Sequence, residues 1–184
     1  MVASAKLLFW QRGYEGSTLG DLERSTGLSR SSLYQAYGSK EGLFDQALEE
    51  YIETFVSPRL SPMERPGAGP ADIRRFFRQL GTLFRGGSAS RRGCLWVNTL
   101  AEFSGRQALV NPRAGEYEQR LHKAFINALS GAPASSAAKG ARVESRARLL
   151  VAATFGVWLA VRVDPREAAL MCDAVVAQVK SWII

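Results

Sequence analysis

Hydrophobic residues recur along most of this chain at intervals of three and four positions, the spacing of one face of an α-helix. The spacing is nearly unbroken from residue 43 to 55, and similar stripes lie within 73–84 and 149–161. No stretch alternates apolar and polar residues for long enough to indicate a β-strand. The pattern therefore predicts an all-α protein of roughly nine helices.

Glycine and serine residues divide the first part of this pattern. Gly13, Gly27 and Gly38 each follow an amphipathic segment and are expected to end a helix. Ser29 and Ser39 stand where the next helix would begin, and serine is a good N-cap. We therefore expect three short helices and a longer fourth one, over residues 2–12, 19–26, 30–37 and 40–56.

The second part begins with a run rich in helix breakers. Residues 57–70 contain four prolines and two glycines, which predicts an interruption between two domains. Residues 130–141 are of low complexity and predict a loop. Asn111-Pro112 and Asp164-Pro165 are typical helix starts. Further helices are expected at 71–85, 93–103, 112–129, 142–163 and 165–182.

The segment from residue 18 to 37 has the layout of a helix-turn-helix. Two helices of about eight residues flank a tight Gly27-Leu28-Ser29 turn, and helices so short are not stable alone. In such a motif the N-terminal end of the second helix enters the major groove of DNA. Here that end carries Arg30, Ser31 and Ser32. Two short helices alone are weak evidence, because many helical proteins contain such pairs.

The distribution of charge along the chain bears on where a nucleic acid would bind. The chain carries a net charge of +7, but residues 1–57 hold five basic and eight acidic residues, a net −3. Net charge alone would therefore place a nucleic-acid site in residues 58–184, away from the predicted helix-turn-helix. From Arg24 to Lys40, however, there are three basic residues and no acidic one. Affinity for phosphates depends on the surface that faces the duplex.

The residues themselves add a resemblance. The segment AKLLFWQRGYEGSTLGDLERSTGLSRSSLYQAYGSKEGLF, residues 5–44, resembles the DNA-binding region of the TetR/AcrR family of transcriptional regulators. The resemblance implies a nine-helix fold, with a helix-turn-helix domain in 1–44, helix four continuing to about 57, and an effector-binding and dimerisation domain in 58–184. The last 140 residues match only the loose plan of the family's later helices. The implied function is a repressor that a small molecule releases from a palindromic operator in double-stranded DNA.

The resemblance also implies roles for individual residues. Tyr34 and Lys40 look like the family's phosphate-contacting tyrosine and lysine, and a helix N-terminus beside an ammonium suits an anion. Arg30 is the candidate for reading a base, because arginine pairs bidentately with guanine, although it could instead contact phosphate. Thr18, as the cap of helix two, could donate to phosphate. Lesser candidates for contact with DNA are Ser31, Ser32 and Gln35.

The sequence departs from the family pattern in two places. Few basic residues precede the first helix, so either affinity is modest or the natural start lies upstream. Glu23 occupies a position that is often alanine and would weaken the acid-free surface if it pointed at DNA. These departures keep open an alternative, a ligand or redox sensor of the same fold with weak or lost DNA binding.

The last two predicted helices are the most apolar long pair. A helix that is hydrophobic nearly all round must be covered on more than one side, and a second copy of the chain can supply that cover. The family resemblance implies a homodimer through this pair, although it could also be plain core. The residues expected at the dimer interface are Leu150, Val157, Val161, Met171, Val175, Val179 and Trp182.

Several aromatic residues lie in the helices predicted between residues 71 and 163. Together with a few polar groups they could line an apolar pocket for a small-molecule effector, although an aromatic stripe is more often core. The candidates for the pocket are Phe77, Trp96, Thr99, Phe103, His122, Phe125, Phe155 and Trp158. Cys94 lies beside a basic pair, which could make it reactive, or it could be an inert buried thiol.

Other classes of protein fit poorly. One histidine without a catalytic constellation, no His/Cys metal spacing and no phosphate-binding glycine loop argue against an enzyme, a metal site or a bound cofactor. The longest apolar run, 149–161, is shorter than the roughly 20 residues of a membrane span. With no signal peptide apparent and two distant cysteines, a cytoplasmic protein is expected.

Overall fold

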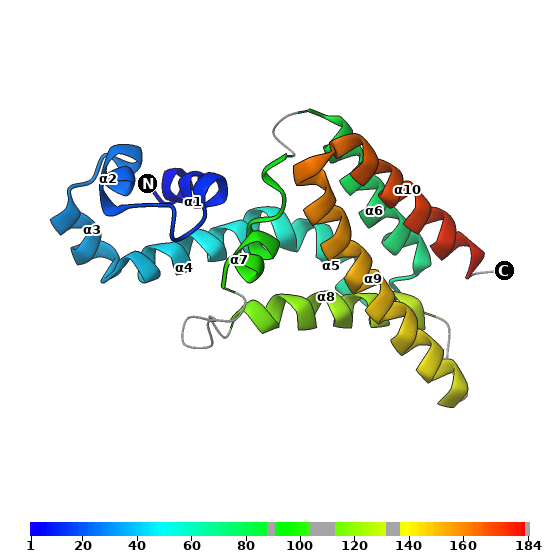
Figure 1. Ribbon diagram of the computed structural model, residues 1–184. Helices are drawn as coiled ribbons and strands as arrows, with labels where there is room; N and C mark the ends of the chain where they lie inside the picture. Colours follow the sequence, from blue (N-terminus) through cyan, green and yellow to red (C-terminus); the bar gives the residue numbers. More distant parts are fainter. Residues whose placement is uncertain (88–90, 104–112, 132–136, 183–184) are drawn as a thin grey trace. The chain divides into compact units, whose positions relative to one another are not determined.

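The computed structural model describes residues 1–87, 91–103, 113–131 and 137–182, and in those ranges it contains helices and no strand (Figure 1). The chain is all-α, as the hydrophobic spacing predicts. Because α4, η1 and α5 follow one another without a break, the described residues form nine continuous helical segments. Their bounds are α1 Val2–Arg12, α2 Leu19–Thr26, α3 Arg30–Tyr37, α4 Lys40–Tyr51, η1 Ile52–Val56, α5 Ser57–Glu64, α6 Pro70–Arg85, α7 Leu95–Phe103, α8 Arg113–Ser130, α9 Ala137–Val163 and α10 Pro165–Ser181.

In the proline-rich run, the predicted break in the helix is wrong for residues 57–64, which form α5 with Pro62 inside the helix. The boundary between the two compact units nevertheless falls in this run, between residues 58 and 59. The π-helical turn η1 directly precedes Pro58, whose missing N–H could not have bonded the carbonyl four residues earlier. Leu60 and Met63 are buried, and Asn127 donates to the carbonyl of Met63. Apolar burial and this cap hold a helix that local propensity disfavours.

Two other predicted boundaries need comment. Helix α9 begins at Ala137 rather than at 142, so it takes in residues that composition assigned to a loop. The predicted start at Asn111-Pro112 lies outside the described residues, as do 132–136 of the predicted loop. The remaining helices agree with the predicted ranges to within one or two residues. Helix ends are commonly uncertain by that amount.

The chain divides into two compact units. The first contains residues 1–58 and 94–110, so it joins α1–α4 and η1 to α7, which the sequence assigned to the second domain. Within it α1 packs on α4 and α2, α3 packs on α4 and α2, and α7 contacts α1 and α4. Phe9, Leu22, Leu33, Leu48 and Trp96 form part of its buried core.

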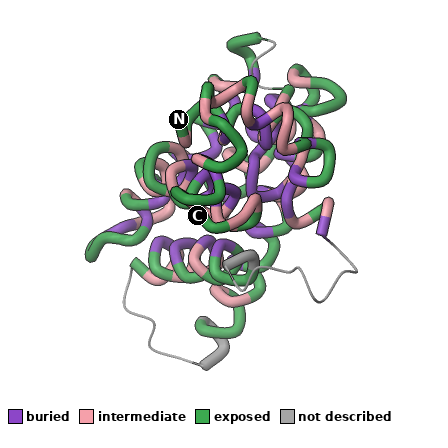
Figure 2. The backbone as a smooth tube through the Cα atoms, turned by 90° about the vertical axis from the view of Figure 1, so that its left-hand side faces the viewer, coloured by how far each residue is buried: buried purple, intermediate pink, exposed green. Residues whose placement is uncertain are grey.

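The second unit contains residues 59–93 and 111–184. Helix α10 packs along α6 and α9, and α8 packs along α9 and α6. Gly81 of α6 lies opposite Cys172 of α10, where a Cβ would be in ordinary van der Waals contact with the Cβ of Cys172 at 3.5 Å. Along most of the tube in Figure 2 buried positions alternate with exposed ones, as expected for helices that bury one face.

The described ranges lack both a membrane-spanning helix and a cluster of metal ligands. Within them no helix is both long and apolar enough to cross a membrane. In the same ranges no group of three or more His, Cys, Asp or Glu side chains could hold a metal ion. Cys94 and Cys172 are both buried, and they are not joined in a disulfide.

Candidate nucleic-acid interface

The turn between α2 and α3 is built from local side-chain hydrogen bonds. The Thr18 hydroxyl accepts the N–H of Asp21, and the Asp21 carboxylate accepts the N–H of Thr18, both at 3.1 Å. This reciprocal capping box starts α2, and Gly27 ends it in the left-handed conformation at φ 74°. Ser29 then caps α3 by accepting the N–H of Ser32. The chain thus reverses within three residues.

Helix α3 lies at the outer edge of the first unit (Figure 1). It buries Leu33 against α2 and α4, whereas Arg30, Ser31, Tyr34 and Gln35 are exposed. The Arg30 guanidinium carbon lies 6.0 Å from the centre of the Tyr34 ring. The helix therefore presents a donor-rich face that starts at its N-terminal turn.

Ser32, the other serine predicted to contact DNA, is less exposed than Ser31. Ser32 is half-buried, and its hydroxyl is 2.9 Å from that of Ser29. The Ser31 hydroxyl also lies 2.9 Å from Ser29, but Ser31 is exposed. Of the two, Ser31 is the better placed for an external partner. Ser32 belongs to the cap of α3.

Thr18 is engaged within its own cap. Both its N–H and its hydroxyl donate to Oδ2 of Asp21. The pKa of Asp21 is lowered to about 2, first by the Thr18 hydroxyl, then by the Thr18 N–H, with smaller contributions from Arg12 and Arg24. Thr18 is therefore the N-cap of α2, and its two donors have an internal acceptor. This arrangement argues against the predicted phosphate contact.

Glu23 contributes a contact that the sequence did not reveal. Its carboxylate accepts the backbone N–H of Arg30 at 2.6 Å. The first residue of α3 is thereby tied to the middle of α2. Glu23 thus fixes the start of the exposed face, and it also brings a negative charge next to it.

Lys40 lies at the beginning of α4. Ser39 caps this helix by accepting the N–H of Gly42 at 3.1 Å. The Lys40 ammonium lies 4.2 Å from the centre of the Tyr14 ring, a cation–π distance. A positive charge and the positive end of the helix dipole therefore meet at one point.

Tyr14 is held in turn by Glu41. The phenol donates to the Glu41 carboxylate at 2.6 Å. Burial first, and this hydrogen bond second, raise the pKa of Tyr14 above its usual value. The same bond is the main reason that the pKa of Glu41 is lowered. The sequence analysis missed both residues, because nothing in the sequence indicates that Tyr14 lies under Lys40.

The residues predicted for an effector pocket are divided between the two units. Trp96, Thr99 and Phe103 lie on α7 and are buried in the first unit. The others belong to the second unit, in which Phe77 stacks on Phe125 with ring centres 6.1 Å apart and Trp158 is buried. His122 and Phe155, two of the eight predicted residues, line a hollow between α8 and α9.

The hollow between α8 and α9 has a volume of about 610 Å³. Val151, Ala152 and Phe155 form an apolar wall, and His122 faces Glu144 with Nε2 3.4 Å from Oε1. Arg148 also pairs with Glu144, at 2.8 Å. Apolar and ionisable groups therefore share this cavity.

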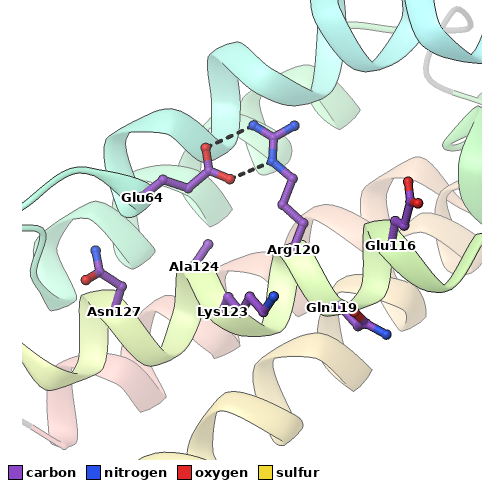
Figure 3. Close-up of a pocket in the computed structure, with 7 residues that line it drawn as sticks. All are labelled: Glu64, Glu116, Gln119, Arg120, Lys123, Ala124 and Asn127. Carbon is purple, nitrogen blue, oxygen red and sulfur yellow. Dashed lines mark hydrogen bonds and ion pairs between the residues drawn. The ribbon is translucent and has the colours of Figure 1, made fainter. Parts of the chain in front are cut away.

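A second hollow lies between α5 and α8 (Figure 3). Glu64 and Arg120 point toward one another across it, with two hydrogen bonds of 2.6 and 2.9 Å. This ion pair raises the pKa of Arg120. The lining is mostly polar, with Glu116, Lys123 and Asn127. Of its charged residues, Glu64 and Arg120 are paired with each other.

The predicted dimer interface needs correction. Leu150, Val157, Val161 and Val179 are buried inside the single chain at 1% exposure or less, so they cannot contact a second copy. Met171, Val175 and Trp182 are only half-buried. The prediction took these apolar residues for the outer face, whereas the chain's own helices enclose them. The large exposed apolar residues of α9 and α10 are instead Leu149, Leu159, Val163 and Leu170.

Cys94 is 1% exposed, and the Tyr51 hydroxyl lies 3.3 Å from its sulfur. This burial favours the inert thiol of the two alternatives. Cys172 is also buried, and that burial raises the pKa of its thiol to about 12.

Comparison with known proteins adds a family signal. Residues 2–47 match the family model described as bacterial regulatory proteins, tetR family. The chain is 45% identical over 127 residues to the transcriptional repressor ComR of Escherichia coli K12. It is 31% identical over 121 residues to the uncharacterised regulator YezE of Bacillus subtilis 168. Each match covers 66% of this chain and 60% of the relative.

Solved structures are similar over nearly the whole chain. A cysteine mutant of the TetR-family regulator CifR, in complex with a 26-base-pair operator DNA, is 25% identical, with a TM-score of 0.78. The match covers 97% of this chain and 92% of that one. A TetR-family regulator from Cytophaga hutchinsonii also has a TM-score of 0.78, at 16% identity, and shows the shared fold alone.

Proposed function

Since the chain belongs to the TetR family of bacterial regulatory proteins, by its N-terminal region and its fold, we propose that it is a DNA-binding transcriptional repressor. The observation that carries the proposal is the exposed face of α3, on which Arg30 and Tyr34 are open to solvent. Lys40, at the start of α4, supplies a positive charge in the same unit. A protein that must reach chromosomal DNA would act in the cytoplasm.

Each exposed group has a role in this proposal. Arg30 reads a guanine through its O6 and N7 atoms, because the guanidinium fork matches that pair of acceptors. Tyr34 and Lys40 bind phosphates, Lys40 with the help of the dipole of α4. Ser31 and Gln35 make further polar contacts. The similarity to the transcriptional repressor ComR and to CifR, which was solved in complex with operator DNA, supports DNA binding as the activity in which these residues act.

The active form is a homodimer. Leu149, Leu159, Val163 and Leu170 are 56, 47, 80 and 59% exposed on two adjacent helices, a large apolar surface for a monomer. A two-fold axis at this surface would present two copies of α3 to the half-sites of a palindromic operator.

The dimer surface can be tested with one substitution and a matched control. Leu159→Glu introduces a charge that a buried interface cannot accept, so sedimentation should show a monomer. Leu7→Glu changes a leucine that is 42% exposed on α1 and should leave the dimer intact. Dimers of unaltered stability in Leu159→Glu would exclude this surface.

A small molecule releases the repressor from DNA. The hollow between α8 and α9 suits a ligand with an apolar body against Phe155 and a polar or ionisable group near His122 and Arg148. Its binding would favour a conformation in which α4 tilts and the two recognition helices change their separation. A liganded dimer with unchanged separation would contradict this mechanism.

The test of DNA binding starts with selection of bound fragments from random duplexes. We expect a palindromic consensus, and retention of that duplex should fall steeply as salt rises. Lys40→Ala should weaken binding to every sequence alike and reduce the salt slope by about 1, because one phosphate contact is lost. Compounds that release the selected duplex can then be screened.

The second candidate function is a sensor with weak or lost DNA binding. Glu23 favours it, because its carboxylate lies at the N-terminus of α3, where phosphates would approach. A selection that enriches no sequence, with binding that does not depend on salt, would support the sensor over the repressor.

A further inference from the structure

A glutamate on α7 is bonded to the turn that leads from α1 to α2. The Glu102 carboxylate accepts the backbone N–H of Tyr14 at 2.9 Å and that of Glu15 at 2.7 Å. Gly13 leaves room for it: a Cβ there would lie 2.7 Å from Oε2 of Glu102, and its φ is +76°. Successive N–H groups around an anion form a nest, in which a carboxylate is held tightly.

The turn held in this way carries the tyrosine beneath Lys40. Tyr14 is 6% exposed and lies against Phe44 and Phe103, with ring centres 5.0 and 5.5 Å away. Its hydroxyl bonds Glu41, and its ring faces the Lys40 ammonium at 4.2 Å. Glu102 is therefore connected to Lys40 through one backbone turn and one aromatic ring.

We propose that Glu102 is a positioning residue for DNA binding, which keeps Tyr14 in place and through it sets the position of the Lys40 ammonium. This inference rests on the proposed function, in which Lys40 binds a phosphate. Without the carboxylate, two N–H groups of the turn lose their acceptor, and the turn is free to move. Tyr14 then no longer supports the ammonium at the start of α4.

A purely electrostatic role of Glu102 predicts stronger DNA binding when its charge is removed, whereas a positioning role predicts weaker binding, so one experiment distinguishes the two. Glu102→Gln removes one negative charge from the first unit, and so does Glu53→Gln at an exposed position of η1. General electrostatics would strengthen DNA binding in both variants. We expect Glu53→Gln to bind the selected duplex as tightly as the natural protein or slightly more tightly. Glu102→Gln should bind it about three- to tenfold more weakly, with a flatter salt slope.

A double-mutant cycle separates positioning from a general structural role. If Glu102 acts through Lys40, Glu102→Gln should have almost no further effect on DNA affinity in a Lys40→Ala background. Additive losses in the double variant would overturn the proposal. Equal affinities of the natural protein and Glu102→Gln would overturn it as well.

A measurement without DNA keeps the inference distinct from the proposed function. Aromatic ring currents at 4.2 Å should shift the terminal methylene protons of Lys40 upfield in the NMR spectrum. We expect that shift to be reduced in Glu102→Gln and in Tyr14→Leu, and retained in Glu53→Gln. An unchanged shift in Glu102→Gln refutes the positioning role even if the protein binds DNA. A shift that is reduced in Glu102→Gln, while the natural protein itself fails to bind DNA, instead refutes the proposed function.

Discussion

The helices around the candidate DNA interface and those of the second unit are held by different forces. Helices α2 and α3 have eight residues each, and each begins with a side-chain cap and ends at a glycine. Helices α9 and α10 have 27 and 17 residues and bury long apolar stripes. A short helix cannot rely on length or on a wide buried face, so individual polar contacts determine where it starts.

This difference has a consequence for function. In the first unit the side chains that cap the helices lie beside those that would touch DNA, as Ser29 lies beside Arg30 and Ser39 beside Lys40. Changes there should affect DNA binding with modest effects on stability. Changes in the second unit should affect stability first.

Phe77→Ala should destabilise the protein most. Phe77 is fully buried on α6 and stacks on Phe125, so its removal leaves a cavity and should cost about 3–5 kcal/mol. The free energy of unfolding from denaturant titration measures this loss. Leu7→Ala, at an exposed leucine, should stay within about 0.5 kcal/mol of the natural protein. A cost for Phe77→Ala below about 1 kcal/mol would contradict the contrast.

Arg30→Ala should change recognition while the protein stays folded. If Arg30 pairs with a guanine, discrimination at one base pair of each half-site should fall by about 1–3 kcal/mol. Competition between duplexes that differ at single positions measures this change. Gln35→Ala, on the same exposed face, serves as a comparison for a lesser contact. If every duplex weakens equally on Arg30→Ala, Arg30 binds phosphate and does not read a base.

Thr18→Ala should lower stability by a smaller amount. The substitution removes the acceptor for the Asp21 N–H and one donor to its carboxylate, and loss of such an N-cap costs about 1 kcal/mol. Denaturant titration should show the loss, and Thr18→Ser should recover most of it. If Thr18→Ala instead leaves stability unchanged and flattens the salt slope of DNA binding, Thr18 contacts phosphate after all.

The contribution of the α2 cap to stability should also depend on pH, through the ionisation of Asp21. The pKa of Asp21 is lowered from 3.8 to about 2, so its ionised form stabilises the folded state above pH 3.8, and this contribution disappears as the pH falls toward 2. The melting temperature should decline over that interval, and less steeply in Asp21→Asn. Identical pH profiles for the two proteins would show that the cap does not depend on the charge.

Much of the fold could be predicted from the sequence because its signals are local. Gly27, Ser29 and Ser39 specify where helices end and begin through their own backbone preferences and hydroxyl groups, without help from distant residues. The α2–α3 turn and the exposure of Arg30 and Tyr34 follow from that local chemistry and from the spacing of Leu22 and Leu33.

The all-α fold and the helix-turn-helix near the start of the chain can be predicted from the amino-acid sequence, because caps and apolar spacing act over a few residues. The contacts between distant residues, such as Glu102 with Tyr14 or Lys40 with the Tyr14 ring, are visible only in the folded structure. The tertiary structure also decided that Leu150 and Val157 face inward while Leu159 faces outward. On a helix that is apolar nearly all round, periodicity cannot choose the buried face; the packing of neighbouring helices does.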